Sequence, residues 1–156
     1  MPIPPRSTGS NTYFVTSATA NRRPLFQLDT NAALFLGTLQ HYRKEVHFKL
    51  HAFVVMPDHI HLLLTPLEIT IERAIGLIKG GFSHRLHSKT LIWQPSFTQH
   101  RIRDREDFLA RLNYIHQNPV RARLIGQSDH YLYSSAYRAA FQNSSEPKSP
   151  FVDNSG

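Results

Sequence analysis

The sequence contains no cysteine, and this absence excludes a disulfide framework and every cysteine-based zinc site. It also has no apolar run that approaches the length of a membrane span. Residues 1–10 lack the apolar core of a secretory signal. We therefore expect a cytoplasmic protein that has no membrane partner.

Acidic residues are few, with 11 Asp and Glu against 18 Lys and Arg and a formal net charge of +7. A basic domain suggests a polyanionic partner, most often nucleic acid, although a soluble protein can also simply be basic. Most of the cations are arginine, whose planar guanidinium suits phosphate oxygens. The 10 histidines are many for 156 residues and favour metal or phosphate chemistry.

The length predicts one domain, which we expect to span residues 1–141. Residues 1–11 are rich in Pro, Ser and Gly and predict a loose arm. Residues 142–156 are polar and contain Ser and Pro, so we expect a disordered tail there.

The spacing of apolar residues predicts the order strand, helix, strand, strand, helix, strand, helix. The segments are residues 13–16, 30–45, 48–56, 60–65, 69–86, 97–102 (with a further extended stretch at 91–93) and a last helix from Asp104. This order predicts an α+β, ferredoxin-like (split βαβ, RRM-like) fold: an antiparallel sheet with helices on one face, plus a C-terminal helix. Thr30 or Asn31 is the expected N-cap of the first helix, and Gly80-Gly81 is expected to bend or interrupt the second.

The last helix has a clear start signal and a clear stop signal. Asp104, with Asp107 three residues on, predicts the N-terminus. Pro119 predicts that the helix breaks or changes direction near Asn118. The expected buried stripe of this helix consists of Phe108, Leu112 and Ile115.

The first group of residues with chemical potential is His59-Ile60-His61, which falls in a predicted strand. Successive side chains of a strand point to opposite faces, so the two histidines share a face and Ile60 faces the core. Two imidazoles in that arrangement can bind one metal ion. The alternative is a pair of exposed or hydrogen-bonded histidines on a half-buried strand.

The second group is Tyr114 and Asn118, which are four residues apart and share one face of the last helix. Arg111 lies on the same face, and the buried stripe is separate from it. The alternative is a surface tyrosine that packs on the sheet, followed by an asparagine that ends the helix.

The two groups make coherent chemistry if the last helix crosses the open face of the sheet. His59, His61 and the amide oxygen of Asn118 would then hold Mg²⁺ or Mn²⁺ against a phosphate. Tyr114 would attack the phosphorus and form a phosphotyrosine. Tyrosine has an ordinary pKa of about 10 and needs activation, for which the sequence identifies no base.

Several segments together resemble the REP-associated tyrosine transposases, members of the HUH single-tyrosine transposase superfamily. The resemblance is carried by HAFVVMPDHIHLLLTP, WQPSFTQHRIRDREDF and YIHQNPVRARL, and extends to YFVTSATANRRPLF and LIKGGFSHRL. It covers about residues 12–138. Asp58, just before the two histidines, also fits the family pattern without an assigned role.

The resemblance implies that His59 and His61 are metal ligands, that Tyr114 is the nucleophile and that Asn118 completes the metal site. It implies a metal-dependent endonuclease and strand transferase that acts on single-stranded DNA near palindromic REP-type hairpins, in the nucleoid. Cleavage would leave a 5′-phosphotyrosine and a free 3′-hydroxyl. One departure is Arg123, where relatives often have Gly.

The remaining candidates concern binding. We predict that DNA backbone contacts come from six arginines, with a solvated face as the alternative: Arg101, Arg103, Arg105, Arg111, Arg121 and Arg123. Unpaired bases could stack on Trp93, Phe97 or Tyr131, although core packing is expected for the first two. His47 and His51 share a face of one strand and are expected to be structural.

Two other functions stay open at the level of sequence. A binding domain would grip hairpin DNA or RNA without cutting it, and its binding would survive loss of Tyr114. A metal-dependent phosphodiesterase acting through water would form no covalent adduct. The chain is expected to act as a monomer or a homodimer.

Overall fold

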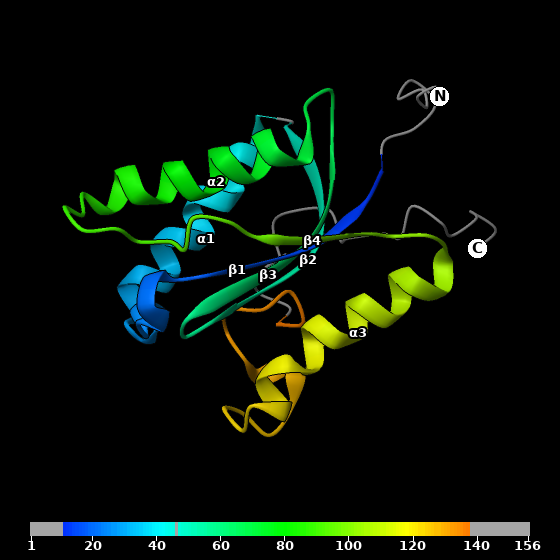
Figure 1. Cartoon of the computed structure of the whole chain (residues 1–156). Coiled ribbons are helices and arrows are strands. Elements are labelled where there is room, and N and C mark those ends of the chain that lie inside the picture. Colours follow the sequence, from blue (N-terminus) through cyan, green and yellow to red (C-terminus); the bar gives the residue numbers. More distant parts are fainter. Residues whose placement is uncertain (1–10, 46, 138–156) are drawn as a thin grey trace.

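A four-stranded antiparallel sheet lies at the centre of the computed structural model, which describes residues 11–45 and 47–137. The strands are β1 (Tyr13–Ala18), β2 (Phe48–Met56), β3 (His59–Pro66) and β4 (Thr98–Arg101). Their spatial order is β2-β3-β1-β4, which is the order of a ferredoxin-like sheet (Figure 1). The fold predicted from sequence is confirmed, whereas the expected tail and nearly all of the expected arm lie outside the described residues.

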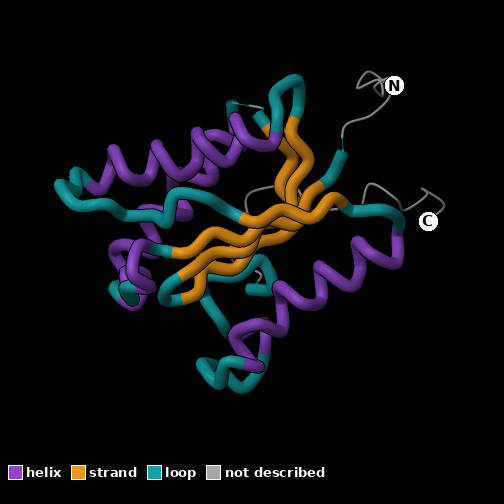
Figure 2. Tube along the Cα trace, in the orientation of Figure 1, coloured by secondary structure: helices purple, strands orange, loops and turns teal. Residues whose placement is uncertain are grey.

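Three helices cover the two faces of this sheet unequally. Helices α1 (Asp29–Lys44) and α2 (Ile71–Leu86) lie on one face, and α3 (Arg105–Arg121) crosses the other (Figures 1 and 2). Short 3-10 turns occur at Ala20–Arg22, Leu25–Gln27 and Ser128–His130. No helix in the described part of the chain is long and apolar enough to span a membrane.

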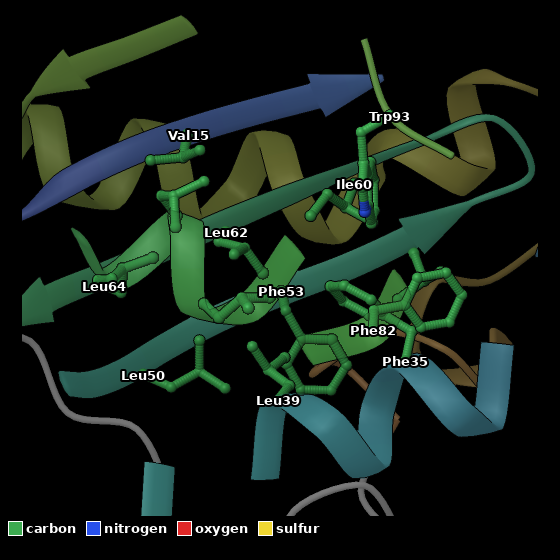
Figure 3. Packing of buried hydrophobic residues seen from close by; sticks show 14 of the residues in the cluster. Val15, Phe35, Leu39, Leu50, Phe53, Ile60, Leu62, Leu64, Phe82 and Trp93 are labelled. Carbon is green, nitrogen blue, oxygen red and sulfur yellow. The ribbon is translucent and has the colours of Figure 1, made fainter. Parts of the chain in front are cut away.

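The larger core lies between the sheet and the pair α1 and α2. Alternate residues of β3 point into it, as the period of two requires. They meet aromatic and aliphatic side chains of both helices, as Figure 3 shows for Ile60, Leu62, Leu64, Phe35, Leu39 and Phe82. Trp93 also packs in this core, with 5% of its surface exposed, and Phe97 packs against it. The core role expected for these two aromatics is confirmed.

The smaller core lies between the sheet and α3. Phe108 and Ile115 are buried there and Leu112 packs against them, which confirms the predicted stripe. A register shift between Leu50 and Ala52 in β2 puts Ala52 and Val54 on this side. Because helices cover both faces, β2 is apolar on both, which explains the continuous stretch of apolar residues in that strand.

Two helix boundaries differ from the sequence prediction. α1 begins at Asp29 without a side-chain cap, because Asn31 donates its amide to the carbonyl of Leu25 at 2.9 Å instead of capping the helix. α3 does begin after Asp104, whose carboxylate accepts the amide of Asp107 at 2.9 Å. However, α3 runs through Pro119 to Arg121, so the predicted break is wrong.

The Gly80-Gly81 pair does not interrupt α2, contrary to expectation. A Cβ atom at position 81 would lie 2.7 Å from the Tyr42 ring, whereas one at position 80 would have no neighbour within 4 Å. Gly81 therefore permits the close approach of α1 and α2, and Gly80 lies on the exposed side of the helix.

This asymmetry predicts opposite effects of the same substitution at the two neighbouring positions. Gly80→Ala is expected to raise the free energy of unfolding by up to about 1 kcal/mol, because Ala is the better helix former. Gly81→Ala is expected to lower it by about 1–3 kcal/mol, because the Tyr42 ring must shift to make room. Chemical denaturation of both variants measures the difference, and equal midpoints would contradict the packing described for Gly81.

The segment after α3 returns to the outer edge of β2. The amide of Val55 donates to Tyr133 at 2.8 Å, and the amide of Ser135 donates to Phe53 at 2.9 Å. Tyr131 donates its hydroxyl to the carbonyl of Val55 at 2.8 Å, and burial, with the neighbouring Tyr133, raises the pKa of Tyr131 to about 12. Its ring packs against the smaller core, so the base-stacking role considered for Tyr131 is not supported.

Candidate active site

Two histidines of β3 lie on the face of the sheet that α3 crosses. β3 is an inner strand between β2 and β1, and His59 and His61 are two positions apart in it. Their ring centroids are 4.8 Å apart. His61 is buried and His59 is partly exposed, while Ile60 points into the opposite core. The face assignment made from the sequence is therefore confirmed.

Each imidazole is oriented by a hydrogen bond at its Nδ1 atom. Nδ1 of His61 lies 2.8 Å from the hydroxyl of Thr16 on β1. Nδ1 of His59 lies 2.7 Å from the carboxylate of Asp58, which also pairs with Arg22 at 3.2 Å. When each Nδ1–H donates to its oxygen, the lone pair of each Nε2 is free to bind a metal, and such outer contacts are usual around metal-binding histidines.

His61 is held in its neutral form. Burial lowers the pKa of His61 to about 3, and the charges of His59 and of two arginines act in the same direction. A neutral imidazole is the form that binds metal ions. Because the unfolded chain takes up this proton near pH 6.5, His61 makes the fold less stable as the pH falls from 6.5 towards 3.

Tyr114 reaches these histidines from α3. Its ring meets the ring of His61 edge to face, with centroids 5.4 Å apart and planes at 78°. The residue keeps 39% of its surface exposed, so the phenol is open to a substrate. Of the convergence predicted from the sequence for Tyr114, Asn118 and the two histidines, the contact of Tyr114 with His61 is present in the structure.

Phe14 of β1 contacts both His61 and Tyr114, and the sequence did not predict it as a residue of this site. Its ring stacks on His61 with centroids 5.3 Å apart and an angle of 17°. It also meets Tyr114 edge to face at 5.8 Å. The strand period placed Phe14 on the same face as Thr16, but only the pairing of β1 with β3 brings it beside His61.

Asn118 follows Tyr114 by one helical turn and is half-buried. Within residues 11–45 and 47–137, its side-chain amide makes no hydrogen bond, so the amide oxygen is available as a ligand. Its role as a metal ligand stays a prediction.

The donor set fits a divalent metal with open coordination positions. The Nε2 atom of His61 is buried and has no hydrogen-bond partner among the described residues, which is costly unless something binds there. Those residues contain no group of three or more His, Cys, Asp or Glu side chains that could hold a metal. A site here would therefore combine His59 and His61 with a neutral oxygen ligand such as the amide of Asn118, and bound phosphate would fill the remainder.

The six arginines predicted to contact DNA divide into two groups. Three already have partners inside the protein: Arg103 and Arg111 pair with Asp107, each at 3.5 Å, and Arg121 contacts Tyr114. The other three are exposed, and in the described part of the chain their side chains form no ion pair or hydrogen bond: Arg101, Arg105 and Arg123. The second group is therefore the better placed to meet phosphate.

Asp107 is a second residue that the sequence reasoning did not assign to this region. Its buried carboxylate accepts from His100 at 2.8 Å and from the amide of Arg103 at 2.9 Å. Burial alone would raise the pKa of Asp107, but these hydrogen bonds and the nearby positive charges lower it to about 2. The cluster ties the start of α3 to β4, two helical turns before Tyr114.

Asp107→Asn is therefore expected to lower the free energy of unfolding at pH 7 by about 1.5–3 kcal/mol, the usual worth of hydrogen bonds to a charged group. The carboxylate contributes its stabilisation above its ordinary pKa of 3.8, and this is lost as the pH falls through about 2. Denaturation between pH 2 and pH 7 should show this acid-dependent loss in the wild type and not in the variant. Identical pH profiles would show that Asp107 is not stabilised by its partners.

Three other histidines have structural contacts outside this site. His51 lies 2.7 Å from the hydroxyl of Thr65, at the opposite end of β3 from His59. His47 lies 3.2 Å from Glu45, and His116 lies 2.8 Å from Ser135. The structural role expected for His47 and His51 agrees with these contacts.

Comparison with known proteins places the chain in a family. Residues 8–118 match the family described as transposase, IS200 like. The REP-associated tyrosine transposase of Escherichia coli is 30% identical over 129 residues, which cover 81% of this chain and 77% of that protein. The solved structure of a REP-associated tyrosine transposase bound to a REP hairpin superposes with a TM-score of 0.75 at 26% identity, covering 99% of this chain and 96% of that one. This chain therefore belongs to the IS200-like transposase family.

Proposed function

We propose that this protein cleaves and rejoins single-stranded DNA beside a hairpin, with Tyr114 as the nucleophile and Mg²⁺ or Mn²⁺ held by His59, His61 and Asn118. The observation that carries the proposal is the contact of Tyr114 with His61, whose Nε2 atom is buried and unpartnered among the described residues. A half-exposed phenol beside a metal-binding pair is the arrangement that phosphoryl transfer to tyrosine requires.

The proposed reaction is a transesterification. The oxygen of Tyr114 attacks the phosphorus and loses its proton to solvent, and the bond from phosphorus to the 3′ oxygen breaks. The departing oxygen takes up a proton, leaving a 3′-hydroxyl and a 5′-phosphotyrosine. Attack by a 3′-hydroxyl on that linkage reverses the step, so strands rejoin without an external energy source. When bound, the divalent cation supplies positive charge that polarises the phosphate.

Binding of the DNA is proposed to use exposed arginines at the two ends of α3. Arg101 and Arg105 lie near its start, and Arg123 follows its end. Hairpin DNA as the partner is supported by the REP hairpin bound to the related transposase. A DNA substrate also implies that the protein acts in the nucleoid. The expectation that it acts as a monomer or a homodimer stays a prediction.

A covalent-adduct assay tests this function. The protein is incubated with labelled single-stranded hairpin DNA and Mn²⁺, denatured, and separated on a gel, with EDTA added to a parallel sample. We expect a labelled protein band that requires metal, and mass spectrometry should place the nucleotide on Tyr114. Cleaved DNA without an adduct would instead indicate attack by water, and bound but intact DNA would indicate a binding domain.

A further inference from the structure

The side chain of Tyr114 has no polar contact among the described residues that would select one rotamer. The residue is 39% exposed, and its hydroxyl makes no hydrogen bond within the part of the chain that the structure describes. Phe14 and His61 make edge-to-face aromatic contacts with the ring and no hydrogen bond to its hydroxyl. An exposed side chain with no polar anchor exchanges between rotamers unless a further contact selects one.

Arg121 supplies such a contact. Its guanidinium lies over the ring of Tyr114, 4.4 Å from the ring centroid. The same side chain donates from Nη2 to the backbone carbonyl of Tyr114 at 3.0 Å. Side chains on a helix lean towards its N-terminus, so a residue two turns later can reach back over the tyrosine. The two contacts together hold the guanidinium over the phenol ring.

This contact depends on the continuation of α3 past Pro119. A helix that ended at Asn118 would carry Arg121 away from the face that bears Tyr114. In the structure the helix continues to Arg121, and the buried Pro119 is accommodated inside it.

The same contact makes Arg121 different from the arginines that are free to meet phosphate. Arg105, on the same helix, is exposed and makes no ion pair or hydrogen bond within the described residues. Arg121 places its guanidinium over the phenol ring and donates one of its N–H groups to the backbone carbonyl of Tyr114. A guanidinium can do both at once because it is planar and rigid, whereas the compact ammonium of lysine cannot.

We propose that Arg121 is a positioning residue that holds the ring of Tyr114 in the orientation facing His61. This inference rests on the proposed role of Tyr114 as nucleophile. Arg121 thus sets the rate of the chemical step and contributes little to DNA affinity, in contrast to the phosphate contact that its charge suggests from sequence.

The test compares Arg121→Gln and Arg121→Lys with the control Arg73→Gln, an exposed arginine of α2 on the opposite face of the sheet. At saturating hairpin DNA, both Arg121 variants should form the adduct about 100-fold more slowly, the usual cost of a misplaced reacting group. Their dissociation constants for DNA, and the dependence of these on salt, should match the wild type. The Arg73 control should be unchanged in every measurement.

Two results would overturn the proposal. Arg121 is a phosphate contact if Arg121→Gln keeps the saturated rate but weakens binding and reduces the salt slope by about one. The same conclusion follows if Arg121→Lys restores the wild-type rate, because a phosphate contact needs only the charge.

An NMR measurement separates this proposal from the proposed function. Nuclear Overhauser contacts from the Tyr114 ring to the rings of His61 and Phe14, identified by their absence in Tyr114→Phe, should be lost in both Arg121 variants because the ring leaves its place beside them. Retention of these contacts would refute the positioning role whatever the activity. Loss of these contacts, with a wild-type protein that forms no adduct, would support the positioning role and refute the nuclease function.

Discussion

Tyr114→Phe should abolish the covalent protein–DNA adduct and metal-dependent strand cleavage, with a loss of at least about 10⁴-fold. Losses of that size follow when a catalytic nucleophile is removed. The variant lacks only the oxygen that would attack phosphorus, while the ring that contacts His61 and Phe14 remains. Folding and hairpin binding should therefore stay as in the wild type, which thermal melting and a gel-shift titration would measure.

The matched control for this experiment is Tyr13→Phe. Tyr13 lies next to Phe14 in β1 but packs against the opposite core, with α1 and α2. The Tyr13→Phe variant should retain the full rate of adduct formation and cleavage. If Tyr114→Phe still cleaves DNA at the wild-type rate, the nucleophile is water and the phosphotyrosine mechanism is wrong.

Substitution of His61 should have the second-largest effect, a loss of Mn²⁺ affinity together with metal-dependent cleavage. His61→Gln removes an imidazole that burial keeps neutral and whose Nε2 atom has no protein partner in the described chain. The affinity should fall by more than the roughly 10–100-fold that follows loss of an outer contact to a metal ligand. Electron paramagnetic resonance of free Mn²⁺ measures this directly, without reference to activity.

The Mn²⁺ affinities of two further variants provide a comparison for His61→Gln. Asp58→Asn weakens the contact that orients His59, so it should lower Mn²⁺ affinity by about 10–100-fold and less than His61→Gln. His84→Gln changes an exposed histidine of α2 and should leave the affinity unchanged. Equal affinities in all three variants would mean that the pair on β3 is not a metal site.

Local periodicity was enough to predict the order of the elements and the shared face of His59 and His61. The strand period of two depends only on the backbone, so it can be counted along the sequence without knowledge of the partner strands. The start of α3 was predictable for the same reason, since Asp104 caps the helix through a bond to an amide three residues away. The separation of Tyr114 from the buried stripe of Phe108 and Ile115 likewise followed from helical spacing.

Local signals failed where a distant contact competed with them. Pro119 carries a strong stop signal, yet it is buried and α3 continues to Arg121. Gly80-Gly81 reads as a weak point in α2, yet Gly81 is the position where Tyr42 of α1 packs closely. In each case the packing between elements outweighs a local preference of about 1–3 kcal/mol.

The sequence by itself thus determined which residues share a face within each strand or helix, and through the long motifs it indicated the family. Only the tertiary structure decided which faces meet: that β1 brings Phe14 and Thr16 to His61, and that α3 lays Tyr114 against the same histidine. It also decided that Arg121 contacts Tyr114 and that Asp107 pairs with His100 of β4. The physical reason is that periodicity is a property of one segment, whereas register and helix docking depend on the simultaneous packing of segments far apart in the chain.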